Sequence, residues 1–403
     1  MKILHLNDHL ASRGGIETYL LSIVPRLEAA GHETIVGFAD GDASLVNEAE
    51  RIPSIGSPDL SRRDEARIAV KRILHRRRPD VVHLHNIQNV GAIAACLETT
   101  PTLFTCHDYR YLCPASTFYF RGTREICRRT CGPACFPITS SKRCMSPHPI
   151  RGWRQYGRVR WMQRNYHRFR RIIAPSAGAA GRLSDAGIEN SRVRVLPYFC
   201  PMPPMPEPRP SPERPTLLFV GRLSDNKGWK YFIDALGRLP NEVQGRMVGS
   251  FTAESEAEVR TCAESAGCRE RLSLFPWAGR DEIVEHYRQA TVTVFPSIWD
   301  ETLGIVGLES LACGVPVIAS DVGGVREWLH DGETGLLVSP KDSAGIAHAA
   351  ERLLRSPGEN QRMGAAGIDL IHQKFAAETH TESLIEEYET ATSGTVRSEA
   401  ATV

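Results

Sequence analysis

Two segments in the second half of the chain decide the fold: Gly221–Gly228, with the sequence GRLSDNKG, and Pro296–Glu309, with the sequence PSIWDETLGIVGLE. Each follows a short apolar run and leads into a helical pattern. Strand, loop and helix in this order form the unit of a parallel sheet, whose ligands bind beyond the carboxyl ends of the strands. We therefore expect the cations Arg222 and Lys227 to lie near a helix N-terminus, where an anionic diphosphate is favoured.

The same alternation of strand and helix runs along the whole chain and predicts an α/β protein with two doubly wound, Rossmann-like domains. Residues 201–215 contain eight prolines, so they are predicted to be an extended linker rather than a helix or a central strand. The expected parts are a domain over 1–200 with a cysteine-rich insertion at about 106–144, the linker, a domain over 216–375, a helix over 376–392 that packs back toward the first domain, and a disordered tail over 393–403.

The composition is that of an ordinary soluble protein of 403 residues, 41% hydrophobic and 24% charged. No run of about 20 apolar residues could span a bilayer, and the N-terminus enters a strand pattern without a signal peptide, so we predict a cytoplasmic protein. The net charge of +2 conceals an asymmetry: residues 1–200 carry 30 Lys and Arg against 17 Asp and Glu, and residues 201–403 carry 19 against 30. A basic half suits phosphates, anionic lipid or nucleic acid.

The order of the motifs resembles that of the family 4 retaining glycosyltransferases, which have the GT-B fold of two domains facing a central cleft. The residues that carry the resemblance are Arg222, Lys227, Glu301, Glu309, Gly323-Gly324 and Asp331-Gly332-Glu333-Thr334-Gly335 in the second half, and Gly14-Gly15-Ile16-Glu17, His83-Leu84-His85 and Thr105-Cys106-His107-Asp108 in the first. The resemblance covers almost the whole chain. It implies that the first domain binds an acceptor and the second a nucleotide sugar.

The resemblance also implies roles for single residues. Arg222 and Lys227 would neutralise the nucleotide diphosphate, so that catalysis requires no metal ion or other cofactor. The other expected contacts are Glu301 and His107 with the donor sugar, Glu309 with the ribose, Gly14 and Gly15 with the distal phosphate, and Trp277, Thr302, Leu303 and Gly304 within the donor-binding segment. Trp277 occupies a place where the family often has a glycine, so the base stays open between a UDP-sugar and a GDP-sugar.

Together these expectations predict an enzyme that moves a hexose-type sugar to an acceptor hydroxyl with retention of the anomeric configuration. The expected setting is the synthesis of cell-surface polysaccharide or glycolipid, and a small-molecule acceptor is the alternative. A protein that binds a nucleotide sugar without transfer is a second hypothesis, which the complete set of charged motif residues disfavours. A nicotinamide-dependent oxidoreductase is disfavoured because no G-x-G-x-x-G follows the first strand, and no motif supports nucleic-acid binding.

Several candidates also have a purely structural interpretation. Arg222 and Lys227 could be solvated loop cations, although their place directly after a strand argues against it. His83 and His85 point to the same side of one strand. With Asp108 they could bind a metal ion, but hydrogen-bonded core histidines are the more common arrangement.

Six of the eleven cysteines fall between residues 106 and 144. The spacing Cys127-x-x-x-Cys131-x-x-x-Cys135 is tight, and with Cys113 it offers the four thiol ligands of a structural zinc site. The spacing is not that of a standard finger or ribbon, so free thiols and disulfides remain alternatives. The insertion follows His107 and is expected to form a lid beside the acceptor entrance.

The segment Arg151–Arg171 contains eight arginines and no acidic residue. Apolar and aromatic residues recur in it every three or four positions, which predicts one helix with an apolar face: Trp153, Tyr156, Val159, Met162, Tyr166 and Phe169. Either this face packs in the core, or the helix meets anionic lipid or a lipid-linked acceptor. The second interpretation predicts peripheral association with the inner face of a membrane.

Overall fold

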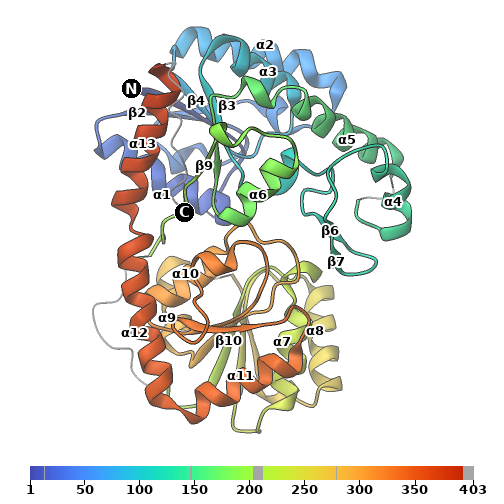
Figure 1. The fold of residues 1–403 in the computed structure, drawn as a ribbon, viewed down its shortest axis with the longest axis vertical. Helices are drawn as coiled ribbons and strands as arrows, with labels where there is room; N and C mark the ends of the chain where they lie inside the picture. Colours follow the sequence, from blue (N-terminus) through green and yellow to red (C-terminus); the bar gives the residue numbers. More distant parts are fainter. Residues whose placement is uncertain (13, 146–147, 203–211, 278, 394–403) are drawn as a thin grey trace. The chain divides into compact units, whose positions relative to one another are not determined.

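The computed structural model describes residues 1–12, 14–145, 148–202, 212–277 and 279–393, and its contacts divide the chain into two compact units (Figure 1). Unit 1 comprises Met1–Thr123, Cys127–Pro201 and the C-terminal segment from Ala377, and unit 2 comprises Met202–Ala376 with Arg124–Ile126. Most of the expected linker over 201–215 and nearly all of the expected tail over 393–403 lie outside the described residues.

Unit 1 is built on seven strands that pair in parallel in the order β3-β2-β1-β4-β5-β8-β9. These strands are β1 (Lys2–Leu10), β2 (Glu33–Gly41), β3 (Ala49–Arg51), β4 (Val81–Leu84), β5 (Thr102–Thr105), β8 (Arg171–Ala174) and β9 (Val193–Val195). Every residue of β4, β5 and β8 is buried, as expected for central strands of a parallel sheet with both faces covered.

Helices connect the strands of unit 1: α1 (Gly15–Ala29), α2 (Arg63–Arg77), α3 (Val90–Thr99) and α6 (Ala177–Asp185), with α13 (Ala377–Ser393) at the C-terminus. The segment between β5 and β8 adds β6 (Tyr119–Phe120), α4 (Cys135–Lys142) and α5 (Pro149–Gln163) to unit 1, and its strand β7 (Glu125–Ile126) is grouped with unit 2. Local chemistry sets several boundaries. The Asn89 side chain caps α3 by accepting from the amides of Gly91 and Ala92, and α13 packs against α1 and β4.

Unit 2 carries six parallel strands in the order β12-β11-β10-β13-β14-β15. They are β10 (Thr216–Val220), β11 (Gln244–Val248), β12 (Leu272–Phe275), β13 (Val292–Phe295), β14 (Val317–Ser320) and β15 (Gly335–Val338). The helices are α7 (Trp229–Arg238), α8 (Ala253–Ser265), α9 (Arg280–Arg288), α10 (Ile305–Ala312), α11 (Ser343–Arg355) and α12 (Pro357–Lys374). In the core, α7 packs against α11 and buries Trp229, Phe232 and Leu236.

Both sheets wind outward from their first strand, so the strand order reverses between β1 and β4 and again between β10 and β13. The predicted class, α/β with two doubly wound sheets, is confirmed. The reversal point of an open α/β sheet is where such folds bind ligands, beyond the carboxyl ends of the strands. In unit 2 the loops at that point belong to the segments Gly221–Gly228 and Pro296–Glu309.

The prediction of one helix over Arg151–Arg171 is wrong in its extent. Helix α5 ends at Gln163, a short 3₁₀ turn follows at Tyr166–Arg168, and Arg171 already belongs to β8. The apolar face is also divided, because Val159 and Met162 are buried whereas Trp153 is 60% exposed. None of the helices in the described parts of the chain is both long and apolar enough to cross a membrane.

Candidate donor-binding site

Two loops of unit 2 meet beyond the carboxyl ends of β10 and β13. The amide of Ile298 donates to the carbonyl oxygen of Asn226 at 2.9 Å, which ties the second loop to the first. Gly228 has a φ of +70°, and a Cβ there would lie 1.8 Å from the carbonyl oxygen of Pro296. Because only glycine permits both this conformation and this approach, the glycine that ends GRLSDNKG brings Lys227 alongside the second loop.

Lys227 and Glu301 form an ion pair where these loops meet. The distance between Lys227 Nζ and Glu301 Oε1 is 2.7 Å, and the two side chains are 20% and 4% exposed. The Ser297 hydroxyl donates to the same carboxylate oxygen at 2.5 Å. Lys227 Nζ also lies 5.4 Å from the ring centroid of Trp299. The ammonium group is therefore held by a carboxylate and an aromatic ring while part of the side chain remains exposed.

Two glycines hold the backbone of Glu301. The Gly324 amide donates to the Glu301 carbonyl oxygen at 2.8 Å. Gly323 has a φ of +51°, and a Cβ there would lie 2.1 Å from that oxygen, so the Gly-Gly motif acts through close packing. In the later motif, the Asp331 carboxylate accepts from the Leu337 amide at 2.8 Å and so shapes the turn before β15.

Glu309, the predicted ribose contact, lies on α10. Its Oε2 accepts a hydrogen bond at 2.9 Å from the hydroxyl of Tyr287, a buried residue of α9. Two residues of this site were not predicted. Nothing in the sequence around Tyr287 indicates a site residue. Ser297 directly follows a strand, and that position could have indicated one. Both hydroxyls orient carboxylates that the sequence analysis did identify.

The other predicted donor residues of unit 2 also follow strands of its sheet. Arg222 is exposed in the loop after β10. Thr302 and Leu303 are buried in the loop after β13, and Gly304, with a φ of +97°, begins α10. Trp277 is half-buried after β12. Arg222 and the Thr302–Gly304 stretch thus lie in the same two loops as the Lys227–Glu301 pair, whereas Trp277 follows a strand nearer the edge of the sheet.

In unit 1, histidines within β1 and directly after β4 and β5 form a hydrogen-bonded chain. His5 Nδ1 lies 3.0 Å from His85 Nε2, His85 Nδ1 lies 2.8 Å from His107 Nε2, and His107 Nδ1 lies 2.7 Å from the Tyr198 hydroxyl. Burial lowers the pKa of His5 and of His107 to about 3, so both rings are neutral at pH 7. A hydrogen bond from His107 to a sugar would have to replace one of these contacts.

His5, His83 and His85 are a group of the described residues whose ligand atoms all lie within 4.8 Å of one another. Hydrogen bonds already occupy most of these nitrogens. His83 Nδ1 contacts the Tyr388 hydroxyl and His83 Nε2 contacts the Thr105 hydroxyl, each at 2.7 Å. This pattern is the one expected of structural core histidines rather than of a preformed ligand set.

The disfavoured metal alternative, His83 and His85 with Asp108, is not brought together among the described residues. The Asp108 carboxylate pairs instead with Arg110, at 2.9 Å, and the same guanidinium pairs with Asp8 at 2.8 Å. Arg110 holds the pKa of Asp108 below its ordinary value, against the effect of burial. Asp108 is thus part of an ionic network that closes the loop after β5.

The glycines predicted to approach a phosphate begin the first helix. Gly14 is the N-cap of α1, with a φ of +115°, and Gly15 is its first residue. The positive φ requires glycine, and a Cβ there would also lie 2.2 Å from a carboxylate oxygen of Glu17. Burial raises the pKa of that carboxyl above its ordinary value. The helix N-terminus therefore faces a carboxylate of its own first turn.

Sequence models of two families match the chain. The model of Glycosyltransferase Family 4 matches residues 13–200, and that of Glycosyl transferases group 1 matches residues 205–369. Among curated proteins, a D-inositol 3-phosphate glycosyltransferase of Xylanimonas cellulosilytica is 32% identical over 182 residues, which are 45% of this chain and 43% of that protein. An alpha-maltose-1-phosphate synthase of Mycobacterium tuberculosis is 36% identical over 176 residues, 41% and 45% of the two chains. The match spans less than half the length of these relatives.

Solved structures are similar over nearly the whole length. The sucrose-phosphate synthase of Thermosynechococcus elongatus has a TM-score of 0.77 at 19% identity, over 98% of this chain and 100% of that one. Anabaena HepE in complex with UDP-glucose has a TM-score of 0.71 at 19% identity, over 97% and 100%. Two matching family models, this fold and the order of the motifs lead to one conclusion: the chain belongs to the family 4 glycosyltransferases, with the GT-B fold.

Proposed function

We propose that the chain is a retaining glycosyltransferase that moves a sugar from a UDP- or GDP-sugar to an acceptor hydroxyl. The observation that carries this proposal is the Lys227–Glu301 pair at the reversal point of the second sheet, with Arg222 exposed in the same loop. Preorganised cations of this kind stabilise the charge that develops on a leaving diphosphate. In support, the matched relatives are named as a glycosyltransferase and a synthase, and Anabaena HepE was solved with UDP-glucose.

Each side chain has a distinct part in this proposal. Lys227 and Arg222 share the charge of the diphosphate, and no divalent ion is needed for that purpose. Glu301 keeps its second carboxylate oxygen for donor-sugar hydroxyls while Ser297 and Lys227 hold the first. Glu309, oriented by Tyr287, accepts from the ribose hydroxyls. The acceptor attacks the face from which the diphosphate leaves, and a leaving phosphate oxygen takes its proton, so the configuration is retained without a dedicated base.

Two classes of acceptor follow from different observations. A small phosphorylated acceptor is supported by the name of the D-inositol 3-phosphate glycosyltransferases, which match less than half of this chain. A cell-surface polysaccharide or glycolipid acceptor, reached at a membrane, is supported by α5, which exposes Ile150 and Trp153 among arginines. We place the small acceptor first, since the relatives' names bear on acceptor chemistry directly.

Release of nucleoside diphosphate from a panel of UDP- and GDP-sugars tests the proposal. The panel is run without acceptor, with inositol phosphate or sugar phosphates, and with a polyprenyl-diphosphate-linked sugar. We expect acceptor-dependent release by the wild type, a product with the donor's anomeric configuration by NMR, and strong loss in Lys227→Ala. Lys230→Ala is the matched control, because Lys230 pairs with Glu258 on the outside of α7 and α8. Donor binding without release to any acceptor would favour the non-catalytic alternative.

A further inference from the structure

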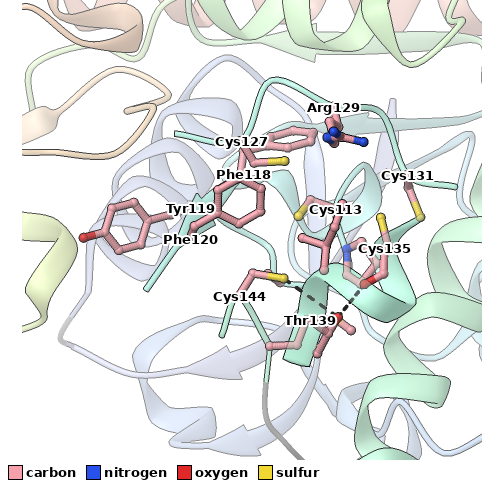
Figure 2. A pocket seen from close by; sticks show the side chains of 14 residues that line it. Cys113, Phe118, Tyr119, Phe120, Cys127, Arg129, Cys131, Cys135, Thr139 and Cys144 are labelled. Carbon is pink, nitrogen blue, oxygen red and sulfur yellow. Dashed lines mark hydrogen bonds between the residues drawn. The ribbon is translucent and has the colours of Figure 1, made fainter. Parts of the chain in front are cut away.

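Five cysteines of the segment between β5 and α5 line one small cavity in unit 1 (Figure 2). They come from separate stretches of chain and are Cys113, Cys127, Cys131, Cys135 and Cys144. The cavity measures about 30 Å³, and roughly 10–15 Å³ on the same measure holds one water molecule. It has room for a single ion or a water molecule.

The segment around this cavity has little apolar core of its own. Between residues 114 and 145, the buried residues that the structure describes are Pro114, Phe118, Tyr119 and Cys131. A stretch that buries so few apolar groups gains little from the hydrophobic effect, so ordered segments of this kind usually depend on a disulfide or a bound metal ion. All five cysteines are free thiols here.

Backbone groups and a positive charge lie close to the sulfurs that line the cavity. The backbone of Ala115 and Phe118 hydrogen-bonds the sulfur of Cys113, and that of Arg129 hydrogen-bonds the sulfur of Cys127. Backbone donors of this type orient metal-bound thiolates and offset their charge. Arg129 also lines the cavity, so a guanidinium lies near the place where negative charge would collect.

Two further arginines act on the same group of sulfurs. Arg160 lies near Cys131, and Arg182 lies near Cys127. Arg182 also lies 4.8 Å from the ring centroid of Phe118, on the wall of the cavity. A zinc ion with four thiolates carries a net charge of −2, and these cations would compensate it.

The thiols do not yet stand at ligand distances. No three of them, among the described residues, have sulfurs that all lie within 4.8 Å of one another, whereas sulfurs around a tetrahedral zinc ion at ~2.3 Å are roughly 3.8 Å apart. The Cys131 thiol contacts the Cys135 sulfur. Cys144 is directed to the Thr139 hydroxyl, at 3.9 Å. Ligation therefore requires that the side chains lining the cavity turn their sulfurs toward one another.

We propose that Cys113, Cys127, Cys131 and Cys135 bind one zinc ion in tetrahedral geometry, and that this ion stabilises the cysteine-rich segment. A disulfide between Cys131 and Cys135 is the competing arrangement. It would leave Cys113 and Cys127 as free thiols facing a cavity of ion size, and it would not use the backbone donors that both of them receive. Soft thiolate ligands in a tetrahedral set favour zinc over magnesium or calcium.

Metal content of the full-length protein tests this proposal without any donor or acceptor, so its outcome is separate from that of the proposed function. The wild type is purified with a tag that binds no metal, from zinc-supplemented medium, without chelator. We expect one zinc per chain by mass spectrometry of the metal. Cobalt replacement should give the charge-transfer and intense visible bands of a tetrahedral thiolate site.

Single serine variants then identify the ligands. Cys127→Ser and Cys135→Ser should lower the zinc content at least tenfold, whereas Cys144→Ser, in the same segment, should retain it. Cys262→Ser, on α8 in unit 2, is a second control. A wild type without zinc whose five thiols all react freely, or one in which peptide mapping finds a Cys131–Cys135 disulfide, would overturn the proposal. So would loss of zinc in Cys144→Ser but not in Cys135→Ser. Even if the variants fail to fold, the cobalt spectrum of the wild type shows whether a tetrahedral thiolate site is present.

Discussion

The two sheets reverse at equivalent points, yet the groups that stand there differ in charge. In unit 2 the loops carry Lys227 and Glu301, which pair at 2.7 Å. In unit 1, His85 and His107 follow β4 and β5 and His5 lies within β1, and these rings are neutral and form a hydrogen-bonded chain. The same topology therefore supports an ionic site in one unit and an uncharged one in the other. The sheet topology brings these side chains together, and their chemistry determines which ligand they can bind.

The two arrangements also respond differently to a ligand. Lys227 is partly exposed and can share its charge with a phosphate without leaving Glu301 unpaired, because Ser297 holds the same carboxylate. The buried histidines gain nothing by ionising, since desolvation disfavours their charged forms. We therefore expect substitutions in unit 2 to act on transfer and those in the histidine chain to act on stability.

The largest effect is expected from Lys227→Ala. It removes a cation from the diphosphate, and loss of one preorganised transition-state partner costs about 100-fold or more in turnover. Arg222→Ala should behave in the same way. Lys230→Ala, three residues away and paired with Glu258, should leave turnover within about twofold. Single-turnover rates with a cognate donor measure these effects. Near-normal rates in both Lys227→Ala and Arg222→Ala would show that these residues do not bind the diphosphate.

A smaller effect is expected from Glu309→Gln. The carboxylate is oriented by Tyr287, and a charged hydrogen bond to a hydroxyl contributes about 1.5–3 kcal/mol, so the Kd for the nucleoside diphosphate should rise about tenfold or more. Calorimetric titration of UDP and GDP measures it. Tyr287→Phe should raise the Kd less, because it disturbs the orientation and keeps the charge. Equal affinity in wild type and Glu309→Gln would contradict the ribose role.

The strands of both units and the donor loops of unit 2 could be predicted from the sequence. Short apolar runs followed by glycine-containing loops predicted the strands, and the charges after two of them predicted the donor loops. The Lys227–Glu301 contact itself joins residues 74 positions apart, and it depends on the adjacency of β10 and β13, which only the sheet order supplies. Tyr388, 305 positions from His83, could not be paired with it from sequence for the same reason.

The sequence pattern of α5 was misleading in a different way. Arginine is almost never fully buried, so a helical pattern with an apolar face suggests that the arginines beside that face are solvated. Arg158 is in fact buried, and its guanidinium donates to the carbonyl oxygen of Arg110 at 2.9 Å. Burial lowers its pKa to about 10, which still leaves it charged at pH 7. A periodic pattern cannot show which cation finds an internal acceptor.

The histidine chain predicts an acid-sensitive unit 1. An unfolded histidine has a pKa near 6.5, whereas His5 and His107 have folded pKa values of about 3. Between these values the unfolded chain binds more protons, so the free energy of unfolding falls as the pH falls through 6.5. Each such histidine contributes a loss of roughly 1.2 kcal/mol, about eightfold in the unfolding equilibrium, between pH 7 and pH 5.5.

Hydrogen exchange of the β1 amides measures this loss within unit 1 alone. Protection in the wild type should fall on acidification, after correction for the intrinsic pH dependence of exchange. His5→Asn should be less stable at pH 7 but should lose less protection between pH 7 and pH 5.5, because one titrating group is gone. An identical pH dependence in the variant would mean that folding does not lower the pKa of His5.

The smallest effect is expected for α5. If α5 binds anionic lipid, some charges of unit 1 also serve binding, and the contrast with unit 2 is weaker. Elsewhere in unit 1 the arginines serve the structure: Arg158 is buried, and Arg154 pairs with Asp59 at 2.7 Å. Near the start of α5, however, Arg151 is exposed beside Ile150 and Trp153, which are 56% and 60% exposed. Exposed apolar groups among cations are typical of a surface that meets anionic lipid.

Co-sedimentation with neutral and anionic vesicles tests whether this end of α5 is such a surface. An arginine near an anionic surface contributes about 1 kcal/mol, so Arg151→Gln should weaken binding at most about fivefold at low salt, and less as the screening length shortens. Trp153→Ser should weaken binding to both kinds of vesicle, because it removes apolar area. Arg154→Gln is the matched control, since its charge is already paired with Asp59. If the wild type shows no preference for anionic vesicles, the basic charge of unit 1 is structural throughout, and the acceptor is a soluble molecule.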